Sequence, residues 1–393
     1  MAFNHAAPKL SALDLEMASH IPPGGNWRDI PLSVPSKRLE QIRESAEAGK
    51  GSRSTYYGRL RGDLPAYTIG TYYNRPGNGC FLHPSQDRTI SHREAARLQT
   101  FPDTFQFRGS QRSICKQIGN AVPPLLAFQV GLALGEGGEM VDVFAGAGGL
   151  SLGMEWAGWQ SIIATDFDKD AVEAFNQNVS PVAFVGDMED DVVLDRLTEA
   201  ATRKRRSRPL ILVGGPPCQG FSTGGKRRTE SDARNQLHRR YTALLEKLEP
   251  DHFVFENVMG LLSMSGGEFF ERISNDFKRV GYDVQSWRMN AAGYGIPQRR
   301  QRVFIVGTRS GCSRPQRPDE WTSPDDKGLE LFPMAPSVSE TLSDLPAILA
   351  GQSGEGLDYA TSPSSLIQEF LRGQSSAAEY LKESSRVLAK RAA

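Results

Sequence analysis

Short apolar runs alternate with amphipathic segments between Met140 and Thr308. The apolar runs predict buried strands, and apolar residues recurring every three to four positions predict helices that pack on them. The expected strands are Val141–Phe144, Ser161–Thr165, Val182–Val185, Leu210–Val213, His252–Phe255, Asp283–Met289 and Arg302–Val306. The expected helices are Leu150–Trp159, Lys169–Asn178, Val192–Ala201, Asn235–Leu248 and Gly267–Val280. This alternation predicts an α/β fold with a doubly wound, mostly parallel sheet, in which ligands bind at the carboxyl ends of the strands.

The two flanks lack this regular alternation. Residues 1–89 contain turn-rich stretches such as Ile21–Pro31, and residues 309–393 are rich in Ser, Pro and Gly before a helical pattern at Ala377–Lys390. Neither flank has enough patterned apolar sequence to predict a large domain of its own.

Composition and cysteine spacing narrow the class of protein. The 393 residues carry 46 basic and 46 acidic side chains, so only local charge is informative. The cysteines at positions 80, 115, 218 and 312 form no C-x-x-C pair, which argues against a zinc site or a disulfide framework. The first twenty residues are too polar for a signal peptide, and no apolar run is long enough to span a bilayer. We therefore expect a cytoplasmic protein with no membrane partner and no metal.

Basic residues cluster at three places, Arg203–Arg208, Lys226–Arg228 and His238–Arg240. Such clusters are usually solvated surface. Only the cluster at Lys226–Arg228 has a positional reason to contact phosphate, because it follows the segment described next.

The most informative segment is Leu210–Ser222, which reads LILVGGPPCQGFS. A buried strand ends at paired glycines, where the backbone can approach its neighbours closely. Two prolines then fix their φ angles and hold Cys218 rigidly above the sheet edge. A thiol presented in this way is a candidate nucleophile, and the competing interpretation is an ordinary buried cysteine.

Three further motifs accompany this segment. A glycine-rich loop lies at Phe144–Gly153, the sequence ENV at Glu256–Val258, and QRRQR at Gln298–Arg302. A glycine-rich loop alone is weak, since many nucleotide-binding folds contain one. Together the four segments resemble the ordered motifs of the DNA (cytosine-5) methyltransferase family. The resemblance implies the sheet of S-adenosylmethionine-dependent methyltransferases with a smaller, irregular target-recognition domain.

The resemblance implies S-adenosylmethionine as the cofactor. Asp166, at the end of the second strand, suits hydrogen bonding to a ribose diol, and Phe167 beside it can stack on adenine. For Asp187, after the third strand, a helix N-cap is the alternative role. The residues that the family pattern assigns to the cofactor are Phe144, Ala145, Gly146, Gly148, Gly149, Leu150, Asp166, Phe167, Asp187, Met188, Gly214, Pro216, Leu237, Asn120 and Ala121.

The same resemblance implies covalent catalysis. A Cys218 thiolate would add to carbon 6 of cytosine and make carbon 5 nucleophilic. Arg300 and Arg302 are candidates for lowering the pKa of this thiol, which is near ~8.5 in free cysteine, and Arg302 would also hold the base carbonyl. Glu256 would contact ring nitrogen 3 and the exocyclic amine, and Asn257 would orient Glu256 or the nucleophile loop. No side chain is assigned to removing the carbon 5 proton, and water is the alternative.

A stacked base is out of reach of these groups, so the target cytosine must be flipped out of the duplex. The expected DNA contacts in the loop after Cys218 are Gln219, Ser222, Lys226, Arg227 and Arg228. Candidate base-reading residues in the flank, for which structural roles are equally open, are Asn26, Trp27, Arg28, Arg59, Arg61 and Tyr72.

The order of motifs departs from the family's usual arrangement. Segments resembling the family's last motifs, Ser91–Asp103 and Gln117–Pro124, here precede the glycine-rich loop. A circular permutation explains this order if Gly135–Glu139 is the new linker, and an ancestral fusion of two genes is the alternative. The expected domains are 1–90, the first part of the recognition domain; 91–139, the permuted motifs; 140–308, the catalytic and cofactor-binding domain; and 309–393, the rest of the recognition domain.

The sequence therefore predicts a site-specific DNA (cytosine-5) methyltransferase acting on double-stranded DNA. An RNA (cytosine-5) methyltransferase and a non-catalytic DNA-binding relative are the alternatives. RNA methyltransferases of this kind that act on tRNA usually have a reduced recognition region, whereas both flanks of this chain are assigned to one. The intact set of Cys218, Glu256 and Arg302 argues against a non-catalytic relative. We expect a monomer in the bacterial cytoplasm, associated with the nucleoid, and a cognate restriction endonuclease without a stable complex.

Overall fold

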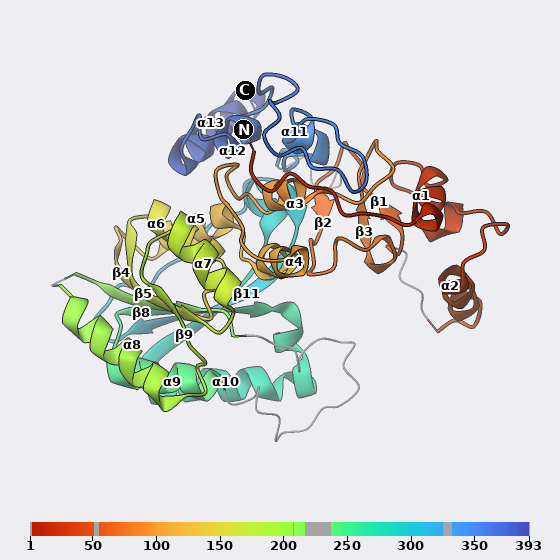
Figure 1. Ribbon diagram of the computed structural model, residues 1–393. Coiled ribbons are helices and arrows are strands. Elements are labelled where there is room, and N and C mark those ends of the chain that lie inside the picture. The colour runs from red at the N-terminus through yellow and green to blue at the C-terminus, as the bar shows by residue number, and fades with distance from the viewer. Residues whose placement is uncertain (1, 51–54, 207, 217–236, 325–331, 393) are drawn as a thin grey trace. The chain divides into compact units, whose positions relative to one another are not determined.

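The computed structural model describes residues 2–50, 55–206, 208–216, 237–324 and 332–392 (Figure 1). The chain divides into two compact units built from separate stretches. The first unit comprises Met1–Asn120, Ala292–Arg300 and Glu320–Ala393, and the second comprises Ala121–Ala291 and Gln301–Asp319. The observed units change after residues 120, 291, 300 and 319, whereas the expected domains end at residues 90, 139 and 308. The functional label of each predicted domain stays a prediction.

The described residues of the second unit form a seven-stranded sheet with the order β6-β5-β4-β7-β8-β11-β9. All neighbours pair in parallel except β11, which is antiparallel to both β8 and β9. The predicted α/β class with a doubly wound, mostly parallel sheet is confirmed. The strands are β4 (Gly138–Val143), β5 (Trp159–Asp166), β6 (Ala183–Val185), β7 (Leu210–Gly214), β8 (His252–Val258), β9 (Tyr282–Asn290) and β11 (Gln301–Arg309).

Helices cover both faces of this sheet. In Figure 1, α5, α6 and α7 lie on one face and α8, α9 and α10 on the other. The chain runs outward from β4 to β6 and then returns to β7 on the other side of β4, so the switch point lies between β4 and β7. The helices are α5 (Pro124–Ala133), α6 (Gly149–Trp156), α7 (Lys169–Asn178), α8 (Asp191–Lys204), α9 (Leu237–Leu248) and α10 (Glu268–Arg279).

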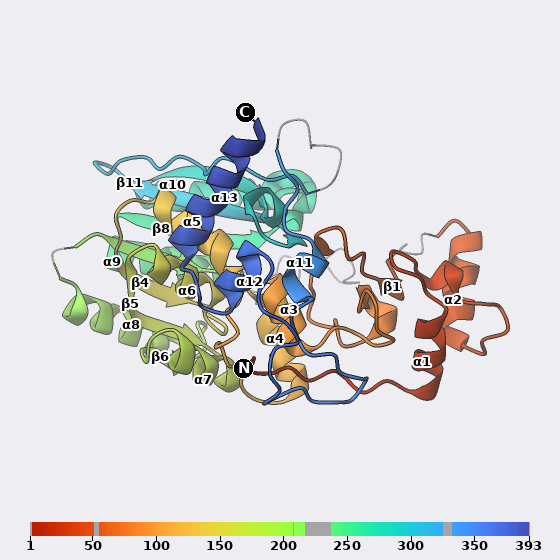
Figure 2. The same cartoon turned by 90° about the horizontal axis from the view of Figure 1, so that it is seen from above.

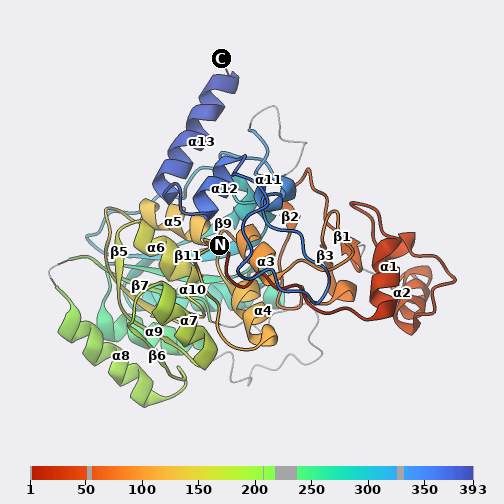
Figure 3. The same cartoon turned by 45° about the horizontal axis from the view of Figure 1, so that its top comes forward.

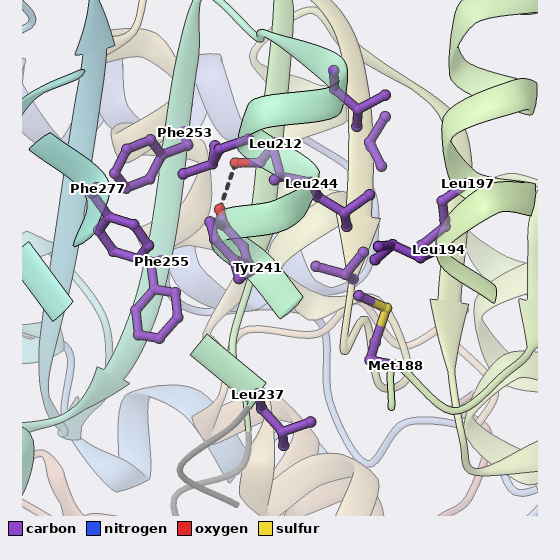
Figure 4. Packing of buried hydrophobic residues seen from close by; sticks show 14 of the residues in the cluster. Met188, Leu194, Leu197, Leu212, Leu237, Tyr241, Leu244, Phe253, Phe255 and Phe277 are labelled. Carbon is purple, nitrogen blue, oxygen red and sulfur yellow. Dashed lines mark hydrogen bonds between the residues drawn. The ribbon is translucent and has the colours of Figure 1, made fainter. Parts of the chain in front are cut away.

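A continuous apolar core fills the space between the sheet and α8, α9 and α10. Figure 4 shows Tyr241 of α9 among Leu212, Phe253 and Phe255, with its hydroxyl donating to the carbonyl of Leu212 at 2.9 Å. Because the buried hydroxyl of Tyr241 has a hydrogen-bond partner, this side chain adds no unpaired polar atom to the core.

The helix α5 packs directly on α6 through two glycines. A Cβ at Gly153 would lie 2.1 Å from the carbonyl oxygen of Pro124, and a Cβ at Gly131 would lie 2.7 Å from the Cβ of Ala157. A four-residue connection then leads from the end of α5 at Ala133 to Gly138 at the start of β4. This short path is what a permuted chain requires, although the permutation itself stays a prediction.

The first unit is less regular. Its helices α1 and α2 pack together around Met17, Leu39 and Ile42 (Figure 3), and α12 lies against α13 (Figure 2). Two short parallel pairs, β1 with β3 and β10 with β2, are its strands among the described residues. The elements are α1 (Ala12–Ser19), α2 (Lys37–Glu47), β1 (Gly58–Arg59), β2 (Ala66–Tyr67), β3 (Cys80–Leu82), α3 (His92–Leu98), α4 (Gln111–Asn120), β10 (Gln298–Arg299), α11 (Val338–Leu342), α12 (Leu366–Leu371) and α13 (Ala377–Ala392).

A buried ionic cluster joins α3 to the C-terminal flank inside the first unit. Arg97 of α3 pairs with Asp103 at 2.5 Å and with Asp344, and Asp344 also pairs with Arg372 at 2.5 Å. The side chains of Arg97 and Asp344 are fully buried. Since buried charges are retained only when they are paired, this cluster fixes the C-terminal flank onto α3.

Candidate active site

A cleft lies at the carboxyl ends of β4, β5 and β6, next to the switch point. Its lining is Phe144, Asp166, Phe167, Gly186, Asp187, Met188, Glu189 and Leu237. Six of these residues were predicted as cofactor contacts, and Gly186 and Glu189 were not. The signal in the sequence that could have identified these two residues is their position on either side of Asp187 and Met188.

The glycine-rich loop contributes Phe144 to the lining of this cleft and has a strained backbone there. Phe144 directly follows β4 and has a φ of 59°, in the left-handed region that a bulky side chain rarely adopts. Gly148 has a φ of 91°, and a Cβ there would lie 2.7 Å from the ring of Phe175. Strain of this kind, which costs about 1–3 kcal/mol, is kept where the surrounding structure demands it, and it clusters at ligand sites.

Asp166 is held by the loop that it faces. Its carboxylate accepts from the amide of Gly146 at 2.8 Å and from the amide of Asp168 at 2.9 Å. Burial raises the pKa of Asp166, and hydrogen bonds from the amides of Asp168, Gly146 and Phe167 oppose that shift. A carboxylate has about four acceptor positions, so capacity remains for a hydroxyl donor such as a ribose diol.

Phe167 and Asp187 present side chains at the cleft. The ring of Phe167 is 67% exposed, although it is large and apolar, which leaves a face free for stacking. The alternative role of Asp187 as a helix N-cap is wrong, because Asp190 caps α8 by accepting from the amide of Val192 at 2.9 Å. Asp187 instead accepts from the amide of Glu189 at 3.0 Å and stays exposed.

The start of the nucleophile loop is held at the end of β7. The side-chain amide of Asn257 donates to the carbonyl of Pro216 at 3.3 Å. A Cβ at Gly215 would lie 2.9 Å from Oε2 of Glu256, so only glycine lets the loop pass this carboxylate undisturbed. The residues predicted beyond this point lie outside the described residues: Cys218, Gln219, Ser222, Lys226, Arg227 and Arg228.

Glu256 and Arg302 form an ion pair beside this loop. Nε of Arg302 lies 2.8 Å from Oε1 of Glu256, and the two side chains are 13% and 11% exposed. They come from β8 and β11, which pair antiparallel with Arg302 opposite Val258. The second unit thus brings Glu256, Asn257 and Arg302 together around Gly215 and Pro216.

Arg300 belongs to the first unit and is fully buried. Its guanidinium donates to the carbonyls of Ile69 at 3.0 Å and of Gly119 at 2.9 Å. These bonds give Arg300 a structural role, and its predicted effect on the pKa of Cys218 stays a prediction. Asn120 ends α4 in the first unit and Ala121 begins the second, so both lie at the unit boundary.

Most of the candidate base-reading residues of the first unit have structural partners. Arg59 is 4% exposed, donates to the carbonyls of Ile21, Ala18, His83 and Gln86, and pairs with Asp87 at 2.6 Å. Of the two roles left open for Arg59, the structure therefore favours the structural one, because its guanidinium is enclosed by the protein.

The other candidates differ in exposure. Trp27 is buried, with Arg28 stacked on its ring at 4.5 Å, and Asn26 caps the short helix that contains both. Arg61 pairs with Asp63 at 2.5 Å on the surface. Tyr72 is 45% exposed, and the guanidinium of Arg75 lies 5.4 Å from the centroid of its ring.

The described ranges contain neither a metal-ligand cluster nor a membrane-spanning helix. Within them, no group of three or more His, Cys, Asp or Glu side chains is placed to hold a metal ion. No helix in the same ranges combines the length and apolar character needed to cross a bilayer.

The comparison with protein families decides the relationship. The sequence model described as C-5 cytosine-specific DNA methylase matches residues 16–136 and 138–364. The chain belongs to the C-5 cytosine-specific DNA methylase family.

Individual relatives match a smaller part of this chain than the family model does. Type II methyltransferase M.DdeI from Desulfomicrobium norvegicum is 38% identical over 237 residues, which are 60% of this chain and 54% of the relative. Type II methyltransferase M.XorII from Xanthomonas oryzae is 41% identical over 46% of this chain and 42% of the relative. The chain thus spans about half the length of the curated relatives it matches. The solved S. pombe Dnmt2 methyltransferase is 18% identical over 45% of this chain and 51% of its own, with a TM-score of 0.36.

One buried acid of this chain was missed by sequence reasoning. Asp142 lies on β4, two residues before Phe144, and is 1% exposed. Its Oδ2 accepts from the hydroxyl of Ser151 at 2.6 Å, and Oδ1 has no partner among the described residues. Burial raises the pKa of Asp142 to about 8, so the group is protonated at neutral pH. The available signal was an acid inside the apolar run MVDVF.

Proposed function

We propose that this chain is a site-specific DNA methyltransferase that methylates carbon 5 of a flipped-out cytosine in duplex DNA. The observation that carries the proposal is the grouping of Glu256, Asn257 and Arg302 around Gly215 and Pro216 in the unit that holds the cleft. Its family membership supports the same reaction.

The cleft fits S-adenosylmethionine, which supplies an electrophilic methyl group when it is bound. Asp166 keeps acceptor positions for the ribose hydroxyls, and the exposed ring of Phe167 offers a stacking face for adenine. The strained turn at Phe144 and the close packing of Gly148 fix the loop that borders the cleft.

The nucleophile in this proposal is the thiolate of Cys218. It forms a bond to carbon 6 of cytosine, and the displaced electron pair makes carbon 5 nucleophilic toward the methyl group. A base, for which water is a candidate, then takes the carbon 5 proton. The electron pair of that bond restores the ring double bond and expels the thiolate.

Glu256 and Arg302 bind the base during this sequence. The partly desolvated carboxyl of Glu256 shares a proton with ring nitrogen 3, which stabilises the charge that builds on the ring. Arg302 keeps Glu256 in place at 2.8 Å and donates to the base carbonyl. Asn257 holds the carbonyl of Pro216 and so positions the nucleophile loop.

The first unit is the proposed target-recognition region, built from both ends of a circularly permuted chain. The hydrogen bond of 2.8 Å from buried Arg88 to the carbonyl of Ile348 supports this view, because it joins the two flanks in one body. Gln219, Ser222, Lys226, Arg227 and Arg228 are proposed to contact the DNA from the loop after Cys218.

The deciding experiment offers radiolabelled S-adenosylmethionine and the purified chain a choice of duplex DNA or tRNA. We expect methyl incorporation into duplex DNA at cytosine carbon 5. Incorporation into tRNA alone would establish the RNA methyltransferase alternative, and no incorporation with intact DNA binding would establish the non-catalytic one.

A second experiment tests the nucleophile. Duplex DNA containing 5-fluorocytosine has no removable carbon 5 proton, so the covalent adduct with Cys218 should accumulate and migrate with the protein in denaturing gels. Cys218→Ser should abolish the adduct, whereas Cys80→Ser, at a buried thiol, is the matched control and should retain it. An adduct that persists in Cys218→Ser contradicts the assignment.

The relatives' names support a place beside a restriction endonuclease, since they are Type II methyltransferases. We propose a monomer in the bacterial cytoplasm that works at the nucleoid and forms no stable complex with the endonuclease. Sedimentation of the purified chain with and without DNA checks the monomer.

A further inference from the structure

The basic segment consists of Arg203, Lys204, Arg205, Arg206 and Arg208, and it lies away from the cleft. Asp191, the first residue of α8, comes three positions after Met188 of the cleft, and the segment begins in the last turn of that helix. A helix of 14 residues is about 20 Å long, so the segment lies about that distance from the cofactor site. The proposed chemistry therefore gives these charges no role.

All five side chains of the basic segment are exposed. Two of them have partners: Lys204 donates to the carbonyl of Ile162 at 2.6 Å, and Arg205 lies 3.8 Å from Asp251. For Arg203, Arg206 and Arg208, no side-chain hydrogen bond or ion pair is found within the described ranges. Three guanidinium groups are thus available to an external anion.

Helix electrostatics accounts for only part of this charge. Arg203 and Lys204 lie in the last turn of α8, where basic groups offset the negative end of the helix dipole. Arg206 and Arg208 lie beyond the C-cap and gain little from that dipole, which acts within the last turn. Their presence needs another reason.

The backbone of the basic segment is anchored to the sheet. Glu139 of β4 is 2% exposed, and its two carboxylate oxygens accept from the amide of Arg206 at 2.9 and 3.1 Å. A rigid element therefore presents Arg206, which lowers the entropy cost of binding a ligand there.

A cleft beside the segment extends the positive surface. Arg196, Arg203 and Lys204 line it together with one acid, Glu199, and Arg196 stacks on the ring of Phe184 at 3.8 Å. Charges spread along exposed chain offer separate contacts rather than one closed cage. This arrangement suits a polymer of phosphates better than a small anion.

We propose that the basic segment binds backbone phosphates of duplex DNA at a second surface, distinct from the catalytic cleft. This inference depends on the proposed function only for the identity of the polymer, which is taken to be DNA. The second surface would hold DNA flanking the target site, or a second duplex, and would add affinity without reading sequence.

The test measures nonspecific duplex binding against salt by fluorescence anisotropy, with the full chain and a labelled duplex of about 30 base pairs, about 100 Å long. The variant is R203Q/R206Q/R208Q. Each lost phosphate contact should make the slope of log K against log salt less steep by about 0.9. Three lost contacts change the ratio of wild-type to variant binding constants by about 40-fold between about 50 and 200 mM salt.

The matched control is R279Q/R309Q/R314Q, which removes the same charge from the same unit. These arginines pair with Asp276 at 3.3 Å, Glu249 at 2.9 Å and Asp283 at 3.2 Å. The control should keep the wild-type slope. Equal flattening in both variants, or none in the basic-segment variant, overturns the proposal.

Further measurements distinguish a misfolded triple variant, an RNA ligand and a failure of the proposed function. The single variant R206Q changes one exposed side chain and should reduce the slope by about 0.9, which covers a triple variant that fails to fold. Loss of binding to single-stranded RNA with unchanged duplex binding would overturn the proposal in favour of RNA. A chain that transfers no methyl group to DNA, yet shows the expected slope change, contradicts the proposed function and supports this inference.

Discussion

Replacing Gly215 with alanine tests the geometry of the candidate site most directly. The added Cβ would lie 2.9 Å from Oε2 of Glu256, whereas ordinary contacts begin at 3.4 Å, so the carboxylate must move by about 0.5 Å. A displacement of about 1 Å at a reacting group can cost 10²-fold in rate, so about half that displacement predicts a loss of about 10-fold in kcat. The backbone at Gly215 is not in the left-handed region, and alanine should therefore change the free energy of unfolding by less than about 1 kcal/mol.

The assay is methyl transfer to duplex DNA at saturating cofactor, with thermal unfolding measured on the same preparations. G70A is the matched control, because a Cβ at Gly70 meets nothing within 4 Å and should leave kcat unchanged. In an E256A background, G215A should cause no further loss, since the displaced carboxylate is gone. Wild-type kcat in G215A, or a full additional loss in the double variant, would refute the reasoning.

Three other variants probe separate parts of the chain. F167A should weaken cofactor binding by about 5- to 150-fold, the equivalent of 1–3 kcal/mol of stacking, as measured by calorimetry, with little change in stability because the ring is 67% exposed. D142N should flatten the pH dependence of the unfolding midpoint: the raised pKa of Asp142, about 8, makes the wild type lose stability as pH rises from about 4 to 8, by up to ~1.4 kcal/mol per pH unit. A D142N slope equal to that of the wild type would place the titration elsewhere. D344A should destabilise the first unit by about 3–5 kcal/mol, since it breaks a fully buried pair with Arg97, and a calorimetric scan without a lowered transition would count against that role.

The sheet of the second unit could be predicted because its sequence carries strong periodicity. Lys169–Asn178 is predicted and found as a helix with the same bounds, and each predicted strand overlaps an observed one. The end of β4 was misplaced by one residue, because Phe144 leaves the strand in a left-handed conformation that an apolar pattern does not reveal.

The first unit could not be predicted in the same way. Its order depends on buried arginines such as Arg59, Arg88 and Arg97, which bind carbonyls and carboxylates far away in the sequence. An arginine in a sequence is usually interpreted as surface, and nothing local marks one that is enclosed. For the same reason, the structural bonds of Arg300 were missed, although the QRRQR motif that contains it was recognised.

The candidate site was predictable only as far as motifs sit at strand ends. The positions of Glu256 and Asn257 followed from the strand that precedes them, and the resemblance supplied their roles. The 2.8 Å pair between Glu256 and Arg302 depends on the antiparallel register of β8 and β11, which the spacing of the motifs does not encode.

The interface between α5 and α6 suggests a position at which the chain can be cut into two pieces that reassemble. Gly131 and Gly153 bring the two helices into backbone contact, and the apolar residues of α5, Leu125, Leu126 and Phe128, are enclosed on the same body as β4. Cutting the peptide bond after Gly135 would leave that interface whole. Two separately made pieces, 1–135 and 136–393, would then have a ready surface on which to reassemble, and restored methyl transfer on mixing would report their union.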